Sequence, residues 1–257
     1  MPITADLYYA VHPGGDPREI PLVLIHGAGG THLYWPAEVR HLPGQLVYAL
    51  DLPGHGKSAG YSLQTVTSYL NPILKWMDVI DLSQAIFAGH SMGSAIAMTL
   101  ALDYPERVQG LVLMGAGARL RVNPEILLKS ESEATYISAV GMVIDWAFSP
   151  EASKRLVELA GKRMAETRPS VLHADFLACD AFDIVDRVSE IRCPTLVICG
   201  ADDRLTPPRF AQFLASQIRR VQLEIVPEAG HMVMLEQPQT VARSMQAFLG
   251  TISAPER

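Results

Sequence analysis

The pentapeptide Gly89-His90-Ser91-Met92-Gly93 has the residue types and spacing of a nucleophile held on a tight turn. Glycine tolerates backbone conformations in which other side chains would clash, so a serine between two glycines can sit on a sharp bend. The apolar run Ala85–Ala88 before the motif predicts a buried strand, and the small and apolar residues Ser94–Leu102 after it predict a helix. In this strand-turn-helix context, Ser91 is predicted to be a catalytic nucleophile with a helix N-terminus behind it.

A serine hydroxyl reacts well only when a base accepts its proton. In enzymes built around this type of turn, the acid and the histidine follow the serine in the chain. His231 is the only histidine beyond residue 173, and it comes directly after the strand-like run Val221–Val226 and the turn that follows. His231 is therefore the predicted general base, and the competing interpretation is a histidine in a surface loop.

The acid is expected after a strand that lies between these two residues. The run Pro194–Cys199 predicts such a strand, and the adjacent pair Asp202 and Asp203 follows it. Neighbouring side chains point in different directions, so only one of the two carboxylates can face the histidine. We predict Asp203 in that position, where it would fix one imidazole tautomer, and Asp202 as a residue that stabilises the loop.

A glycine-rich turn could supply the oxyanion hole. The buried strand Leu22–Ile25 leads into His26-Gly27-Ala28-Gly29-Gly30. This turn can present the Ala28 N–H toward the reacting carbonyl, with the Met92 N–H as the second donor. A phosphate-binding loop is the alternative, but the spacing lacks a Lys-Ser/Thr pair and a Gly-x-Gly-x-x-Gly pattern. His26 is expected to brace this turn rather than to catalyse.

Together these motifs resemble the α/β-hydrolase family, and in particular its single-domain esterases and lactonases. The resemblance covers nearly the whole chain apart from its middle, and it is specific for the fold and the triad but weak for the substrate. Carbon–carbon bond hydrolases of the family usually have a tryptophan where this chain has Met232, and haloalkane dehalogenases need a carboxylate where it has Ser91. The matching segments are His26–Gly29, Asp51–Ser58, Gly89–Gly93, Tyr104–Val108, Gly200–Asp203 and Gly230–His231.

Strand-like and helix-like segments alternate along the chain, which predicts an α/β fold with a mostly parallel sheet flanked by helices. The predicted strands are Asp6–Val11, Pro21–His26, Leu46–Asp51, Ala85–Ala88, Val108–Met114, Thr195–Cys199 and Gln222–Val226. The predicted helices are Ser62–Val79, Met92–Tyr104, Pro208–Gln217 and Pro238–Leu249. The core would comprise residues 1–117 and 188–257. The Asp51–Ser58 segment is expected to be a structural turn.

The middle of the chain, residues 118–187, contains no convincing strand. Its predicted helices are Ile126–Ser130, Glu133–Trp146, Pro150–Glu166 and Pro169–Phe182. The resemblance implies that this insertion forms a helical cap above Ser91 after the sixth strand of the fold. Its aromatic residues would then help to line an acyl pocket or would simply hold the cap together. The predicted substrate-binding residues are Trp35, Trp146, Phe176 and Met232.

The basic residues of this segment show no cluster aimed at one point. Arg119 and Arg121 lie just past a strand end, where they could meet a substrate carboxylate. Solvated loop charges are the favoured interpretation of both.

Composition excludes several function classes. Hydrophobic residues make up 49% of the chain and charged residues 19%, with a formal net charge of −6. This balance argues against a nucleic-acid partner and against binding to anionic membranes. Three cysteines show neither metal-ligand spacing nor even pairing, and the stretch Met1–Asp6 lacks a secretory pattern. A cytoplasmic protein that needs no metal or cofactor is expected, with its oligomeric state left open.

The predicted activity is that of a serine carboxylesterase that cleaves small to medium acyl esters through an acyl-enzyme intermediate. Ser91, His231 and Asp203 would form the triad. A lactonase or thioesterase of the same fold is the nearest alternative. A slow-turnover ligand-binding receptor on this fold is the alternative from another class.

Overall fold

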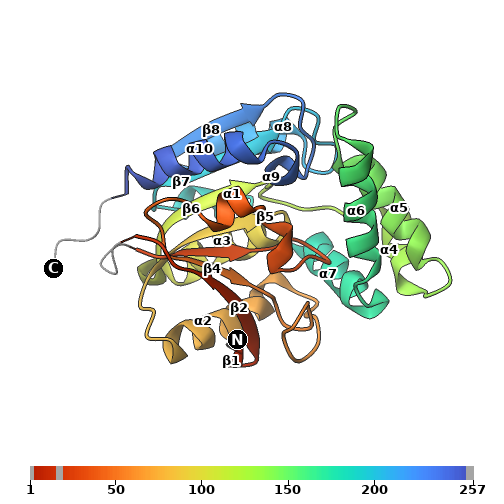
Figure 1. Ribbon diagram of the computed structural model, residues 1–257, viewed down its shortest axis with the longest axis horizontal. Helices are drawn as coiled ribbons and strands as arrows, with labels where there is room; N and C mark the ends of the chain where they lie inside the picture. Colours follow the sequence, from red (N-terminus) through yellow and green to blue (C-terminus); the bar gives the residue numbers. More distant parts are fainter. Residues whose placement is uncertain (1–2, 16–19, 253–257) are drawn as a thin grey trace.

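The computed structural model describes residues 3–15 and 20–252, which form an eight-stranded sheet with helices on both faces (Figure 1). The strand order is β1-β2-β4-β3-β5-β6-β7-β8. β2 pairs antiparallel with β1 and β4, and all pairings from β4 to β8 are parallel. The strands are β1 (Ile3–Thr4), β2 (Leu7–His12), β3 (Leu22–Ile25), β4 (Val47–Leu50), β5 (Ala85–His90), β6 (Val108–Met114), β7 (Thr195–Gly200) and β8 (Val221–Val226).

Helices cover the sheet in two layers. One layer holds α2 (Leu70–Val79), α3 (Met92–Asp103) and α8 (Pro208–Gln217), and the other holds α1 (Ala37–Arg40), α9 (Val233–Glu236) and α10 (Pro238–Leu249). No helix that the structure describes is both long and apolar enough to cross a membrane.

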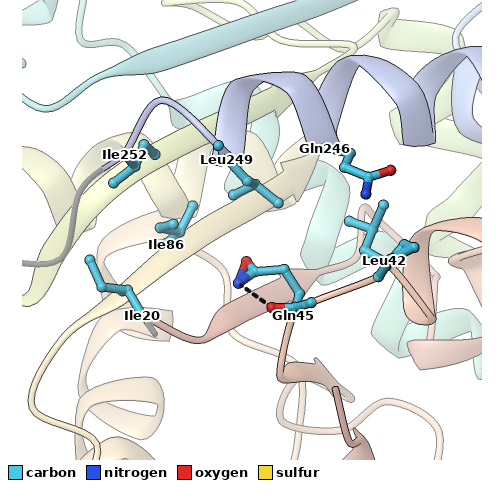
Figure 2. A pocket seen from close by; sticks show the side chains of 10 residues that line it. Ile20, Leu42, Gln45, Ile86, Gln246, Leu249 and Ile252 are labelled. Atoms are coloured by element: carbon cyan, nitrogen blue, oxygen red, sulfur yellow. Dashed lines mark hydrogen bonds between the residues drawn. The ribbon is translucent and has the colours of Figure 1, made fainter. Parts of the chain in front are cut away.

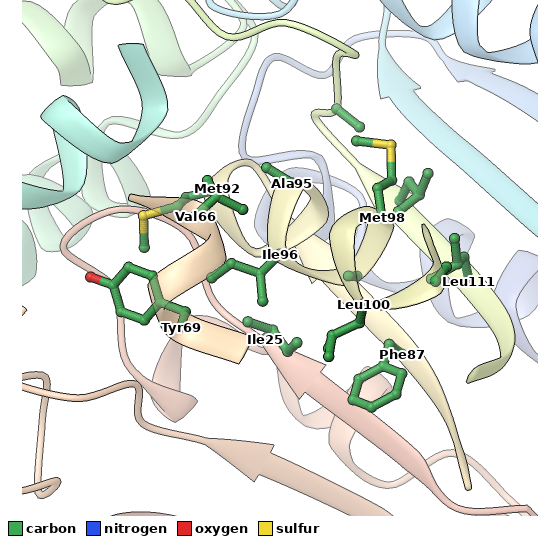
Figure 3. Packing of buried hydrophobic residues seen from close by; sticks show 14 of the residues in the cluster. Ile25, Val66, Tyr69, Phe87, Met92, Ala95, Ile96, Met98, Leu100 and Leu111 are labelled. Atoms are coloured by element: carbon green, nitrogen blue, oxygen red, sulfur yellow. The ribbon is translucent and has the colours of Figure 1, made fainter. Parts of the chain in front are cut away.

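Both faces of the central strands are buried, which explains their nearly continuous apolar runs. In β3, Val23 and Ile25 face the cluster under α2 and α3, whereas Leu22 and Leu24 face the cluster under α10. Figure 3 shows the first cluster, in which Ile96 and Leu100 of α3 pack over Ile25 and Phe87 of the sheet. This packing gives β5 and α3 a fixed relation, and the turn between them holds Ser91.

Residues 118–187, which we call the helical insertion, lie between β6 and β7. Its helices are α4 (Pro124–Glu131), α5 (Tyr136–Ala147), α6 (Lys154–Ala165) and α7 (Pro169–Ala181), and they gather at one side of the sheet (Figure 1, green to cyan). A short antiparallel neck closes the insertion, because the Leu120 N–H donates to the Phe182 carbonyl and the Ile184 N–H donates to the Ala118 carbonyl. The four helices share an apolar cluster that includes Ile126, Val140, Met164, Leu172 and Phe176.

The alternation of segments predicted the fold class and the seven longer strands correctly. The short elements β1, α1 and α9 were not predicted, since two to four residues carry too little periodicity. The helix expected from Ser62 begins later, with a 3₁₀ turn (Val66–Tyr69) before α2, because Thr65 caps it by accepting from the Ser68 N–H. Met1 and Pro2, part of the stretch without a secretory pattern, lie outside the described residues.

Candidate active site

Ser91 occupies a strained turn between β5 and α3. Its φ of 53° and ψ of −116° are rare for a residue with a side chain, and such strain persists only where the surroundings impose it. The glycines on either side are sterically required. A Cβ atom on Gly89 would lie 2.2 Å from the Gly93 carbonyl oxygen, and a Cβ atom on Gly93 would lie 2.1 Å from that of Ile25. The sequence motif is therefore needed for the turn itself.

His231 and Asp203 form a buried hydrogen-bonded pair. The Nδ1 atom of His231 lies 2.9 Å from Oδ2 of Asp203. The same carboxylate accepts from the Leu205 N–H at 2.9 Å and from the Thr206 N–H and hydroxyl, both at 2.8 Å. Burial alone would raise the pKa of Asp203, but the neighbouring imidazole and these donors hold that pKa below its usual value. Asp203 is thus kept as a carboxylate that orients the histidine.

The end of β6 brings Ser91 and His231 together. The Met114 carbonyl accepts from the Ser91 N–H at 2.8 Å. The next residue, Gly115, has a φ of +56°, and a Cβ atom there would lie 2.8 Å from Cε1 of the His231 ring. Both side chains line one cavity of about 390 Å³. Because Nδ1 of His231 is engaged by Asp203, its Nε2 is the atom left for proton transfer.

Neither the Ala28 N–H nor the Met92 N–H has an acceptor among the described residues. Ala28 lines the cavity, and Met92 is the first residue of α3. The turn that carries Ala28 packs closely on the nucleophile, since a Cβ atom on Gly27 would lie 3.1 Å from the Ser91 Cβ atom. The two groups are therefore available to donate hydrogen bonds to an oxyanion.

The helical insertion binds the turn Gly27–Gly30 through both backbone groups of Gly29. The Gly29 N–H donates to Oδ2 of Asp175 at 2.8 Å, and the Thr167 hydroxyl donates to the Gly29 carbonyl at 2.9 Å. Asp175 also accepts from His55 at 2.7 Å, from the Tyr69 hydroxyl at 2.8 Å and from the Ser62 hydroxyl at 2.5 Å. The position of the turn thus depends on the insertion.

Asp175 and His55 form an ion pair in which both side chains are 0% exposed. Nδ1 of His55 donates to the Pro53 carbonyl at 3.0 Å, so both ring nitrogens are donors and the ring is an imidazolium. Burial works against both charges, but each partner outweighs it: the pKa of His55 is raised and that of Asp175 is lowered. Sequence reasoning missed Asp175. An aspartate within the apolar stretch Val171–Cys179 was the available signal.

His26 braces the turn, as expected. Its Nδ1–H donates to the Gly27 carbonyl at 2.8 Å, and its Nε2 accepts from the Leu52 N–H at 3.0 Å. Burial and the nearby His55 charge lower the pKa of His26 to about 4, so the ring stays neutral.

Three of the four predicted substrate-binding residues lie at the site. Trp146 and Phe176 line the cavity of Ser91, and Met232 lines an adjoining enclosed space of about 60 Å³ that also touches Ser91. The prediction for Trp35 was wrong. Its side chain is 0% exposed within the apolar cluster beneath α10 and lines no cavity found at Ser91 in the described part of the chain. An aromatic residue that follows a site loop can turn either way, and this one turns into the core.

Asp202 binds the helical insertion and not His231. Its Oδ2 accepts from the Ser149 hydroxyl at 2.8 Å, which ties the acid loop to the helical insertion. Glu236 acts similarly and was not predicted: its carboxylate accepts from the Gly230 N–H at 2.9 Å and from the Ser149 N–H at 2.8 Å. The loops of Asp203 and His231 are therefore both anchored to Ser149.

A separate cavity of about 490 Å³ lies at the opposite ends of the strands (Figure 2). Ile86 lines it near the start of β5, and Ser91 follows the other end of that strand, five residues further along the chain, or about 16 Å at ~3.3 Å per residue. Its polar side chains are those of Gln45 and Gln246, and no nucleophile or charged group lines it among the described residues. The lining of this cavity that the structure describes therefore does not suggest a catalytic site. Within residues 3–15 and 20–252, no group of three His, Cys, Asp or Glu residues is placed to hold a metal ion.

Known proteins resemble this chain over nearly its full length. A protein of Caulobacter sp. (strain K31) named "Putative carbamate hydrolase RutD" is 29% identical over 95% of both chains. The solved structure of a thermophilic esterase is 30% identical, with a TM-score of 0.81 over 96% of this chain and 99% of that one. That of an N-acyl homoserine lactone degrading enzyme is 27% identical, with a TM-score of 0.78 over 94% and 96% of the two chains.

Most of the chain also matches one protein family. Residues 22–244 match the family described as "Alpha/beta hydrolase family". This range begins at β3 and ends within α10, so it includes the turn of Ser91, both loops of the Asp203–His231 pair and the helical insertion. The chain belongs to the alpha/beta hydrolase family.

Proposed function

We propose that this chain is a cofactor-independent serine hydrolase that cleaves carboxylic esters of small to medium size. The observation that carries the proposal is the buried Asp203–His231 pair, which shares a cavity with Ser91 on its strained turn. The free N–H groups of Ala28 and Met92 beside that serine add the second requirement of acyl transfer, a site for negative charge.

In the first half of the reaction, the Ser91 hydroxyl oxygen attacks the ester carbonyl carbon while Nε2 of His231 takes the hydroxyl proton. The carbonyl oxygen becomes an oxyanion that the two N–H groups stabilise. When the intermediate collapses, the bond to the alkoxy oxygen breaks. Nε2 gives its proton to that oxygen, so the alcohol leaves and the acyl group remains on Ser91.

In the second half, a water molecule attacks the acyl carbon and Nε2 of His231 takes one of its protons. Collapse of the second intermediate breaks the bond to the Ser91 oxygen, which recovers the proton from His231, and the acid leaves. Asp203 stays ionised throughout and stabilises the imidazolium. The helical insertion covers the site, and we propose that residues 118–187 serve as its cap.

Lactone hydrolysis is the second candidate, because the chain is 27% identical to a lactone-degrading enzyme over 94% of its length. The chemistry is identical except that the leaving alcohol stays attached to the acid. A panel of γ- and δ-lactones measured beside open esters of equal carbon number distinguishes the two. Turnover below one per hour on every ester and lactone would instead favour a ligand-binding receptor.

The decisive test is covalent labelling of Ser91. A fluorophosphonate should form one adduct, located at Ser91 by mass spectrometry, and Ser91→Ala should abolish both labelling and hydrolysis of 4-nitrophenyl butyrate. Loss of a triad member costs about 10⁴–10⁶ in kcat. Asp202→Asn is the matched control and should still be labelled. An adduct at another residue, or activity retained in Ser91→Ala, overturns the assignment.

A further inference from the structure

Two arginines line the cavity that contains Ser91 and His231. Arg204 follows Asp203 directly in the acid loop, and Arg121 follows the neck of the helical insertion. They are 83 residues apart in the sequence, which is why the sequence showed no basic cluster here. The expectation that Arg121 is only a solvated loop charge was therefore incomplete.

The charge of Arg204 is not neutralised within the described part of the chain. Its Nη1 lies 3.4 Å from the Asp145 carbonyl oxygen, which is a neutral acceptor, and no carboxylate there forms an ion pair with it. The guanidinium lies over the Trp146 ring, 5.6 Å from the ring centre. Trp146 lines the same cavity. This cation–π contact orients the guanidinium and leaves its donors free.

Arg121 is only partly neutralised. It donates to the Asp180 carbonyl, and its Nη2 lies 3.5 Å from Oδ2 of Asp183. That carboxylate oxygen is also bound by Nε of Arg119 at 2.5 Å. The carboxylate of Asp183 is therefore shared by the guanidinium groups of Arg119 and Arg121. The carboxylate of Asp180 accepts from the Val122 N–H at 3.0 Å, and no ion pair joins it to Arg121 among the described residues.

A second cavity of about 580 Å³ adjoins the first. Arg121, Arg204 and Leu205 line both cavities, so the two guanidinium groups stand at their boundary. Arg119 and Arg209 line the second cavity as well. Four arginines thus surround this opening in a chain whose net charge is −6, with Asp183 as their one carboxylate partner among the described residues.

The other side chains that line the cavity of Ser91 are mainly apolar, and they include Ile126, Val143 and Phe176. A substrate that fills the cavity therefore contacts Ser91 and His231, apolar side chains and two positive charges. Guanidinium binds carboxylate in a planar, two-point geometry, which fixes orientation as well as affinity.

We propose that the preferred substrate is an ester or lactone whose acyl part carries a carboxylate a few carbons from the reacting carbonyl. Arg204 binds this carboxylate, and Arg121 supports it. The proposal rests on the hydrolase function argued above and adds the substrate class. The simplest members of the class are monoesters of short dicarboxylic acids.

The kinetic test compares monoethyl glutarate with ethyl pentanoate, two ethyl esters with five-carbon acyl chains, by the release of ethanol. The wild-type ratio of kcat/KM for the charged ester to that for the neutral ester should exceed one. Arg204→Gln should lower this ratio about tenfold to a hundredfold, as expected for loss of a charge-assisted hydrogen bond, and Arg121→Gln less. Arg155→Gln, which changes an exposed arginine of α6 outside both cavities, should leave the ratio unchanged.

Binding supplies an independent measurement that needs no turnover. By calorimetry, glutarate should bind the Ser91→Ala variant, and adding Arg204→Gln should weaken that binding at least tenfold. Raising the salt concentration should also weaken it, because salt screens the charges. Two results would each overturn the carboxylate site and leave the hydrolase function standing. In one, neutral esters are hydrolysed but glutarate does not bind. In the other, Arg204→Gln leaves the ratio of kcat/KM values unchanged. Failure of the hydrolase function itself would show separately, as an absence of labelling at Ser91.

Discussion

At the scale of single residues, adjacent side chains can have unrelated tasks. Asp203 holds Nδ1 of His231, whereas Asp202 binds the Ser149 hydroxyl. The different directions of neighbouring side chains allowed this division of tasks to be predicted from the sequence, which named Asp203 as the partner of His231 and Asp202 as the residue that stabilises the loop.

Substitution of Asp203 should lower activity much more than substitution of Asp202. Asp203→Asn should lower kcat for 4-nitrophenyl butyrate by about 10³–10⁴, because an amide at this position favours the wrong imidazole tautomer. Asp202→Asn should lower it by less than about tenfold, since only a link to the insertion is weakened. Circular dichroism should show both variants folded. If Asp202→Asn proves the more damaging, the roles are reversed.

Some residue assignments could not be made from the sequence. The order of Ser91, Asp203 and His231 along the chain leaves few competitors, so a motif and a strand pattern suffice to find them. Trp35 and Arg204 depend instead on which way a loop side chain turns. That direction is set by packing between distant segments, such as the contact of Arg204 with Trp146.

At the scale of elements, α7 positions the turn Gly27–Gly30 through the buried carboxylate of Asp175. Asp175 receives hydrogen bonds from Gly29, His55, Ser62 and Tyr69, which belong to separate segments of the core. A helix could be predicted here from its apolar pattern. The partners of a buried aspartate could not, because they lie more than 100 residues away in the sequence.

Asp175→Asn should therefore reduce both stability and activity. Breaking a buried ion pair leaves one charge uncompensated and costs about 3–5 kcal/mol in the free energy of unfolding, measured by urea denaturation. The new amide also places a donor near the Gly29 N–H or His55, so kcat should fall while Ser91 still reacts with a fluorophosphonate. Asp186→Asn, an exposed change at the end of the insertion, is the control. A variant with wild-type stability would show that the pair contributes little.

The same pair predicts how stability depends on pH. Burial alone would lower the pKa of His55, but Asp175 raises it above 6.5 in the folded protein. The stabilisation is therefore fully present below pH 6.5 and is lost as the pH rises through the raised value. The free energy of unfolding should fall between pH 6 and pH 9 by more in the wild type than in His55→Gln. Equal slopes in the two proteins would contradict a charged His55.

At the scale of the whole molecule, a sheet buried on both faces positions Ser91, Asp203 and His231, and the insertion lines the cavity beside Ser91. β3, β5, β6, β7 and β8 run parallel, so the loops after them meet at one edge of the sheet. The alternating pattern of the chain was enough to predict this architecture. The anchoring of the insertion at Gly29, Ser149 and Asp175 was not predictable, since it joins surfaces that only the folded chain brings together.

The size of the cavity beside Ser91 predicts a limit on acyl length. Each methylene buried against the apolar wall contributes about 0.8 kcal/mol, or about fourfold in kcat/KM, until the cavity is full. The space beside Ser91 is about 390 Å³, and hydrogen bonds fix the insertion that lines much of it. Among neutral 4-nitrophenyl esters, kcat/KM should rise from acetyl to butyryl or hexanoyl and then fall, and triglyceride emulsions should be poor substrates. Values that still climb at dodecanoyl, or a jump in rate at an oil interface, would mean that the insertion opens and that the enzyme acts as a lipase.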